Sequence, residues 1–185
     1  MSAEPKYKTF YFKGSQVHVI IAPSKNISVH YTLKGHKYGV NCSYFNMNTR
    51  KTIPAGDYNR PFIVIKKEGA VRISDKKSDI EKEDKVASAG SWILRGGKVY
   101  HSNDHFTKGF RNMLVARTCI GIDKDGNVHM IVVRKANFSK LQALGLKLGL
   151  TEMVNVDGGT STIMKKNGKI IVSSKRPVVN YVVCD

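Results

Sequence analysis

The sequence predicts an α+β fold: a single domain with a mixed, predominantly antiparallel β-sheet, one clear helix late in the chain and few others. Three observations support this prediction. Short segments rich in aromatic and β-branched residues recur along the chain, and turn residues separate them. A helical period is convincing only once, over residues 138–149, and a short apolar strand candidate follows it. The 185 residues suffice for one ordinary domain with a sizeable core, and no linker or repeat divides residues 1–185.

Turn residues divide the chain into successive strand candidates. Lys13-Gly14-Ser15 separates two β-rich segments, and Asp125-Gly126 between two apolar segments is the strongest hairpin signal in the chain. Polar residues after position 45 predict a loop that reaches Asp57, and the charged segment 74–85 predicts a solvated loop. In chain order, we expect strands at residues 7–12, 16–22, 28–33, 39–45, 61–66, 69–73, 86–95, 98–100, 114–122, 127–134, 153–157, 168–172 and 178–183.

The predicted helix at residues 138–149 has one apolar face. Leu141, Leu144 and Leu148 recur at positions i, i+3 and i+7. We expect Ser139 to cap the N-terminus of this helix by accepting a hydrogen bond from a backbone amide. Gly149 lies where a glycine commonly ends a helix in the left-handed conformation.

The net charge of the chain is strongly positive. Thirty-one Lys and Arg against 14 Asp and Glu give +17, which favours an anionic partner or substrate, or serves only solubility. Five of the acidic residues fall between positions 75 and 84, so few carboxylates remain elsewhere. The sequence has no basic helix, zinc finger or aromatic RNA-binding motif, so nucleic-acid binding is not favoured.

Targeting and cysteine patterns predict a cytoplasmic protein without a membrane partner. No apolar segment approaches the ~18–20 residues that a membrane span needs, and the N-terminal segment lacks the features of a secretory signal. Cys42, Cys119 and Cys184 form no Cys-x-x-Cys pair and no zinc-binding spacing. We therefore expect reduced thiols and no metal or cofactor, while the oligomeric state is open.

The first candidate for chemistry is the segment that begins at Asp157. This residue ends an apolar segment, and two glycines and three hydroxyl residues follow it. Glycines allow backbone amides to approach a ligand closely, and a run of amides and hydroxyls can form an anion-binding nest. The carboxylate can then act as a base, a nucleophile or a metal ligand. Composition alone favours the simpler interpretation, a tight turn in which Asp157 caps its own backbone.

Two arginines are the next candidates. Arg117 lies inside an apolar strand segment, where a buried arginine needs a partner, and its guanidinium fork suits phosphate or carboxylate. The alternative is that Arg117 points outward to solvent. Arg176 precedes Pro177 at a predicted strand entry, with Asn180 nearby, and is either a ligand contact or surface charge.

Aromatic and histidine residues supply weaker candidates. Asn41 suits a hydrogen bond to a sugar hydroxyl, and Tyr44 and Phe45 suit stacking on a sugar or base; a turn and a core aromatic pair explain them equally well. His101 and His105 are spaced four residues apart, which fits a metal or acid–base pair. A solvated loop is the favoured interpretation of the two histidines.

Taken in order, these segments resemble the phosphodiester glycosidase domain family over about residues 39–183. The family usually has a third glycine at the position of Thr160 and commonly two serines where this chain has Ser161-Thr162, and its members are usually exported. The matching segments are Asn41–Phe45, Pro54–Asp57, Ala89-Gly90 with Gly97, Arg117–Asp123 with Asp125-Gly126, the helix at 138–149, Val154–Thr162 and Arg176–Asn180.

The resemblance implies a hydrolase that cleaves the bond between the anomeric carbon of a sugar and a phosphodiester oxygen. It implies that Asp157 activates water or stabilises an oxocarbenium-like centre, and that Arg117 and Arg176 hold the phosphate. The implied catalytic residues are Asp157, Arg117, Thr160 and Ser161; the implied substrate-binding residues are Asn41, Tyr44, Phe45, Gly90, Gly158, Gly159, Thr162, Arg176 and Asn180.

Two other functions stay open at this point. A phage or mobile-element enzyme could use the same fold to degrade a nucleotide-type phosphodiester signal in the cytosol, because fold does not fix substrate. A non-enzymatic basic protein could bind nucleic acid or another anionic ligand. The expected partner in the favoured function is an anionic small molecule, a sugar or nucleotide phosphodiester.

Overall fold

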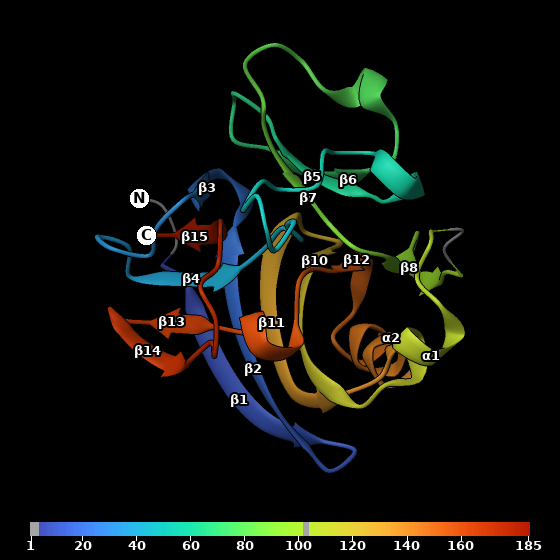
Figure 1. Ribbon diagram of the computed structural model, residues 1–185. Coiled ribbons are helices and arrows are strands. Elements are labelled where there is room, and N and C mark those ends of the chain that lie inside the picture. The colour runs from blue at the N-terminus through green and yellow to red at the C-terminus, as the bar shows by residue number, and fades with distance from the viewer. Residues whose placement is uncertain (1–3, 102–103) are drawn as a thin grey trace.

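The computed structural model describes residues 4–101 and 104–185, and its strands form three sheets (Figure 1). The largest sheet has seven strands in the order β1-β2-β11-β10-β12-β8-β9, and each neighbouring pair is antiparallel. Its strands are β1 (Lys6–Phe12), β2 (Ser15–Pro23), β8 (Trp92–Arg95), β9 (Lys98–Val99), β10 (Val115–Asp123), β11 (Asn127–Ala136) and β12 (Leu150–Asn155).

Two smaller sheets complete the β-structure of the described residues, and their pairings are also antiparallel. The five-stranded sheet has the order β14-β13-β4-β15-β3, and the three-stranded sheet has the order β6-β5-β7. The predicted α+β class with predominantly antiparallel strands is confirmed. The bounds are β3 (Ile27–His30), β4 (Tyr38–Asn41), β13 (Met164–Lys166), β14 (Lys169–Val172) and β15 (Tyr181–Cys184), with β5 (Phe62–Ile65), β6 (Val71–Ser74) and β7 (Lys85–Ser88) in the smallest sheet.

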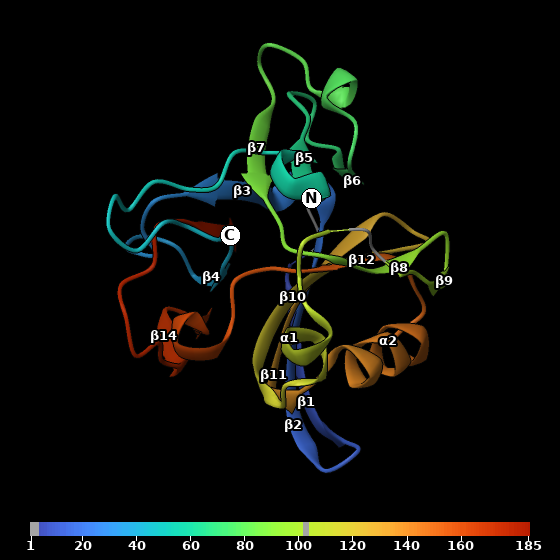
Figure 2. The ribbon, with the colours of Figure 1, turned by 45° about the vertical axis from the view of Figure 1, so that its right-hand side comes forward.

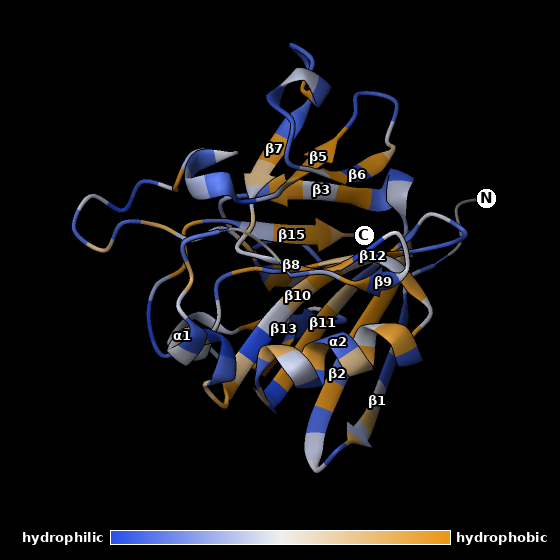
Figure 3. Ribbon diagram, turned by 90° about the vertical axis from the view of Figure 1, so that its right-hand side faces the viewer, coloured by the Kyte–Doolittle hydropathy of each residue, from blue (hydrophilic) through white to orange (hydrophobic). Residues whose placement is uncertain are grey.

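The seven-stranded sheet buries both of its faces, because successive side chains of a strand point to opposite sides. On one face, Ile20 and Met130 join a core cluster that also contains residues of the two smaller sheets, such as Val40 and Ile63. On the other face, neighbouring strand residues such as Ile131 pack against the helix α2 (Phe138–Lys147). Figure 3 shows hydrophobic residues along β5 and β15 and hydrophilic residues in the outer connections.

The helix α2 confirms two predictions, the buried face formed by the leucine period and the left-handed glycine that ends the helix. Leu141 and Leu144 are fully buried, and Gly149 has φ +70° just after the helix. The predicted cap is wrong: Asn137, not Ser139, has the extended backbone of an N-cap, and its side chain accepts a hydrogen bond from the Lys140 amide. The short helix α1 (Lys108–Asn112) has no apolar period that the sequence could reveal.

The 3₁₀ helices are η1 (Ser24–Asn26), η2 (Asp57–Asn59), η3 (Lys77–Asp79) and η4 (Gly159–Ser161).

The strand predicted over 86–95 is wrong, because this segment divides between two sheets. β7 belongs to the three-stranded sheet and β8 to the seven-stranded sheet. Asn155 holds the connection between β7 and β8 by two hydrogen bonds. Its backbone carbonyl accepts from the Gly90 amide at 2.8 Å, and its side-chain oxygen accepts from the Ser91 amide at 2.6 Å. A Cβ atom on Gly90 would lie 2.8 Å from both the Asn155 side chain and the Tyr44 ring, so this crossing requires glycine.

Several further boundaries differ from prediction, and β13 was not predicted; two of the differing boundaries matter for the site. β4 ends at Asn41, so Tyr44 and Phe45 lie in the connection that follows it. β12 ends at Asn155, so Asp157 begins a turn rather than ending a strand. None of the described helices has the length and hydrophobicity that crossing a membrane requires.

Candidate active site

The turn at Asp157 lies where the chain crosses from the seven-stranded sheet to the five-stranded sheet. Figure 2 shows the segment after β12 passing across the molecule toward β14. The Val156 amide donates to the Thr118 carbonyl at 2.9 Å, and the Asp157 amide donates to the Cys42 carbonyl at 2.8 Å. The turn is therefore anchored both to β10 of the seven-stranded sheet and to the residue that follows β4.

The Asp157 carboxylate is buried and paired with an arginine. Its exposed fraction is 4%, and Arg176 Nη2 lies 2.9 and 3.2 Å from its two oxygens. The Gly158 amide donates to the same carboxylate at 3.0 Å, and Arg176 Nε donates to Ser161 Oγ at 2.5 Å. Burial raises the pKa of Asp157, although Ser161 and Arg176 favour its charged form. The result is a buried carboxylate held in one position.

A pocket of about 310 Å³ opens beside this carboxylate, and we call it the active-site pocket. Seven of the residues singled out in the sequence line it together, although they are up to 132 positions apart in the chain. Asp157, Arg117 and Arg176 line the pocket, and Asn41 does not. The lining residues are Tyr44, Phe110, Met113, Val115, Arg117, Asp157, Gly158, Gly159, Thr160 and Arg176.

Arg117 is a buried wall of the pocket, with 1% exposure, and not a solvated side chain. Its Nη2 donates to the carbonyls of Phe110 and Met113 at 2.8 and 3.1 Å, and its Nε donates to the Ala136 carbonyl at 3.3 Å. Its guanidinium also lies 4.5 Å from the centre of the Phe110 ring. A bidentate phosphate contact through Nε and Nη2 is therefore unavailable, which leaves Nη1 for a ligand.

Asn41 and Asn180 are buried and hold the backbone around the pocket. Asn41 Nδ2 donates to the Asp157 carbonyl at 2.5 Å, and its Oδ1 accepts from Thr118 Oγ1 and from the Ile163 amide. Asn180 binds Ser43 twice, by accepting from its amide at 2.8 Å and donating to its hydroxyl at 3.0 Å. Neither asparagine lines the active-site pocket, so both position the site rather than reach into it.

The remaining predicted residues divide between the pocket wall and its support. Tyr44 lines the pocket, and its hydroxyl accepts from Asn155 Nδ2 at 2.9 Å. Phe45 is buried beneath Arg176, whose guanidinium lies 5.3 Å from the ring centre. Ser161 is fully buried, whereas Thr160 is exposed at the rim. Thr162, 3% exposed, has a hydroxyl without a hydrogen-bond partner among the described residues.

Sequence reasoning missed a buried arginine behind Tyr44. Arg60 is 3% exposed, and its guanidinium lies 5.0 Å from the centre of the Tyr44 ring and 4.8 Å from that of Phe106. Its Nη2 lies 2.7 Å from Nε2 of His105, and both His105 and His101 are exposed. No group of three or more metal-ligating side chains occurs among the described residues. The only local signal for Arg60 was its position before Pro61 and an apolar strand.

The chain belongs to a family of glycosidase-type hydrolases. A family model described as phosphodiester glycosidase matches residues 30–184, which confirms the resemblance that the motifs indicated. No curated protein sequence matches this chain significantly.

Solved structures share the fold. The catalytic domain of zebrafish N-acetylglucosamine-1-phosphodiester alpha-N-acetylglucosaminidase, auto-inhibited by its pro-peptide, is similar with a TM-score of 0.76 and 19% identity, over 98% of this chain and 81% of that chain. A hypothetical protein from Synechocystis is similar with a TM-score of 0.76 and 12% identity, over 97% of this chain and 61% of that chain. This chain thus spans less than two thirds of the Synechocystis protein.

Proposed function

We propose that this protein hydrolyses the glycosidic C–O bond between the anomeric carbon of a sugar and a phosphodiester. The observation that supports this function is the arginine-held carboxylate of Asp157, which shares one pocket with Arg117 in a chain of the phosphodiester glycosidase family. The name of the zebrafish relative describes an enzyme of N-acetylglucosamine-1-phosphodiester. The sugar that this chain accepts is not fixed by that likeness, since the two chains share 19% identity.

A phosphate leaving group needs charge neutralisation more than it needs a proton. Arg176 is the more accessible of the two cations of the pocket and can bind a phosphate oxygen while Nη2 stays near Asp157. Arg117 adds a buried positive charge and a free Nη1. The Thr160 hydroxyl at the rim supplies a neutral donor. Donors fixed in place before the reaction stabilise developing charge without reorganising.

Asp157 is the carboxylate that faces the reacting carbon in this proposal. A water oxygen forms a bond to the anomeric carbon, the bond from this carbon to the phosphate oxygen breaks, and the electron pair leaves with the phosphate. Asp157 takes the proton of the attacking water, and its negative charge stabilises the oxocarbenium-like centre. The raised pKa of Asp157, caused by burial, makes it a stronger base than an exposed aspartate.

Hydrolysis in ¹⁸O-labelled water tests the bond that breaks. We expect the label in the released sugar and none in the phosphate monoester. Label in the phosphate would mean attack at phosphorus and would overturn the glycosidic assignment. A panel of sugar and nucleotide phosphodiesters tests the alternative that the substrate is a nucleotide-type signal. Turnover of the nucleotide phosphodiesters alone would support that alternative and would exclude sugar phosphodiesters in general as the substrate class.

A further inference from the structure

A second pocket adjoins the active-site pocket, and the Gly159-Thr160 turn belongs to both. It measures about 310 Å³ and shares Val115, Gly159 and Thr160 with the active-site pocket. A ligand that passes over this turn therefore reaches both pockets. The other residues that line the second pocket are Ala116, Arg134, Thr162, Val172, Ser173 and Lys175.

The second pocket carries positive charge that the protein does not neutralise. Arg134 and Lys175 line it and are exposed, and neither cationic group has an ion pair or hydrogen bond within residues 4–101 and 104–185. None of the described residues that line it is acidic. In the active-site pocket, by contrast, Asp157 already neutralises Arg176. Arg134 and Lys175 are therefore exposed cations without an acidic partner, beside the buried Arg117 of the active-site pocket.

Backbone geometry places both cations at the turn. β10 and β11 shift register where Val115 pairs with Ala136 and Arg117 pairs with Val133, so Arg134 and Lys135 oppose the single residue between them. Such a bulge redirects a side chain at the edge of a site. On the other side, the Lys175 amide donates to the Thr160 carbonyl at 2.7 Å. Two separate segments of the chain therefore place the backbones of Arg134 and Lys175 beside the second pocket.

Thr162 provides an independent observation at the same place. It lines the second pocket and is 3% exposed, and its buried hydroxyl has no partner among the described residues. Buried polar groups are nearly always hydrogen-bonded, so an unpaired hydroxyl in a pocket wall is consistent with a ligand that completes it.

We propose that the second pocket binds a second phosphate group, carried by the part of the substrate beyond the scissile phosphodiester. Two unpaired cations with the hydroxyls of Thr160 and Ser173 match a dianion with several acceptor oxygens. The substrate class is then a sugar joined by a phosphodiester to a group that itself bears a phosphate. The hydrolysis of such a substrate rests on the proposed function. The binding of its second phosphate group rests on the second pocket alone.

A matched pair of substrates tests the inference. One is a sugar 1-(methyl phosphate), and the other is the same sugar 1-phosphate esterified with 2-phosphoethanol. We expect wild-type kcat/KM to be at least about tenfold higher for the second substrate, as one hydrogen bond to a charged group would give. Arg134→Gln and Lys175→Gln should each lower this preference while leaving kcat/KM for the methyl ester unchanged. Equal kcat/KM values in the wild type would overturn the inference.

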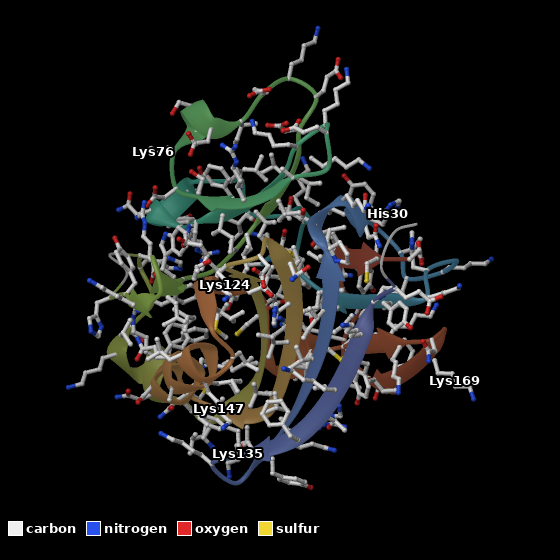
Figure 4. The ribbon with its side chains drawn as sticks, turned by 180° about the vertical axis from the view of Figure 1, so that it is seen from behind. His30, Lys76, Lys124, Lys135, Lys147 and Lys169 are labelled. Atoms are coloured by element: carbon white, nitrogen blue, oxygen red, sulfur yellow. The ribbon has the colours of Figure 1, made fainter. Side chains whose placement is uncertain are left out.

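Lys135→Gln is the control for general electrostatic steering. Lys135 neighbours Arg134, is exposed and lines neither pocket, and Figure 4 shows it at the lower end of the sheet. Its substitution removes the same charge and should keep the preference. An equal loss of preference in Lys135→Gln and Arg134→Gln would assign the effect to net charge and overturn the pocket.

Binding of inorganic pyrophosphate, measured by titration calorimetry, separates the second pocket from the catalytic proposal. Affinity that falls at least about tenfold in Arg134→Gln and Lys175→Gln, but not in Lys135→Gln, supports the pocket even if no sugar phosphodiester is hydrolysed. Such a result with no turnover would refute the proposed function alone. Equal affinity in all four proteins would refute the second pocket, whatever the activity.

Discussion

Asn41 holds the backbone of Asp157 by a hydrogen bond of 2.5 Å between its side-chain amide and the Asp157 carbonyl, 116 positions further along the chain. Asn41 closes β4, and Asp157 opens the turn after β12, so one side chain ties two sheets together at the site. Its oxygen is also occupied, by Thr118 and Ile163. Asn41 can therefore affect turnover by holding the Asp157 backbone, without contacting the substrate.

Asn41→Ala should lower both stability and turnover. The substitution leaves the buried Asp157 carbonyl and the Thr118 hydroxyl without this partner, which costs about 1–3 kcal/mol of unfolding free energy. Because Asn41 does not line the pocket, kcat should fall more than KM rises. Urea denaturation and steady-state kinetics measure the two effects. A variant with a raised KM and an unchanged kcat would indicate direct substrate contact instead.

Arg117→Met should destabilise the protein, because the arginine binds two backbone carbonyls at the end of α1 and one at the end of β11. Loss of these bonds leaves the carbonyls of Phe110, Met113 and Ala136 without their buried donor, at a cost of about 2–4 kcal/mol. Thermal unfolding measures the loss, and hydrogen exchange at residues 108–113 shows whether α1 loosens. Arg134→Met, at an exposed arginine without these bonds, is the matched control and should unfold like the wild type.

Asp157→Asn should abolish most turnover and leave the protein folded. The amide keeps the size of the side chain but cannot take a proton from water or stabilise positive charge, so we expect kcat to fall by a factor of about 100 or more. Circular dichroism and kinetics test the two parts. A folded variant that keeps wild-type turnover would remove Asp157 from the mechanism. If the wild type shows no turnover and Asp157→Asn binds an anionic ligand as tightly as the wild type does, the result would favour a non-enzymatic anion-binding protein over an enzyme.

The pH dependence of stability should have opposite signs at Asp157 and Asp123. Burial raises the folded-state pKa of Asp157 above its ordinary 3.8, so the folded protein binds more protons than the unfolded chain between the two values. Its contribution to stability therefore falls as pH rises through that window. At Asp123 burial opposes charge, but hydrogen bonds from His129 and Asn127 prevail and lower the pKa. The contribution of Asp123 is present above its unfolded pKa and is lost as pH falls through the folded value.

Unfolding free energies of wild type, Asp157→Asn and Asp123→Asn between about pH 2 and 7 test this difference. The wild-type advantage over Asp123→Asn should grow with pH, and the difference from Asp157→Asn should change in the opposite direction. Parallel pH profiles for the two variants would contradict the assigned shifts. Only the change with pH is diagnostic, since each substitution also alters hydrogen bonds of the folded protein and so shifts the unfolding free energy by an amount that the pKa does not set.

Local sequence signals predicted the parts of the fold that depend on neighbouring residues. The Asp125-Gly126 turn joins β10 and β11 as its sequence indicates, and the leucine period of α2 faces the core. The errors occur where distant residues decide. Asn137 outcompetes Ser139 as the cap, and Asn155 divides the segment 86–95 between two sheets. Arg60 was not predicted as a site residue because Tyr44 and Phe106, the aromatic rings nearest its guanidinium, are remote from it in sequence.

The sequence by itself determined most of the strands and turns, the strong positive charge, the family and the presence of an Asp-Gly-Gly turn, because these depend on short-range order and composition. Only the tertiary structure decided what each polar residue does. In the folded protein Asp157 pairs with Arg176, and two nitrogens of Arg117 donate to backbone carbonyls. The side chain of Asn41 is buried and donates to the Asp157 carbonyl. Hydrogen bonds and burial are properties of groups brought together by the packing of three sheets, and no residue type carries them alone.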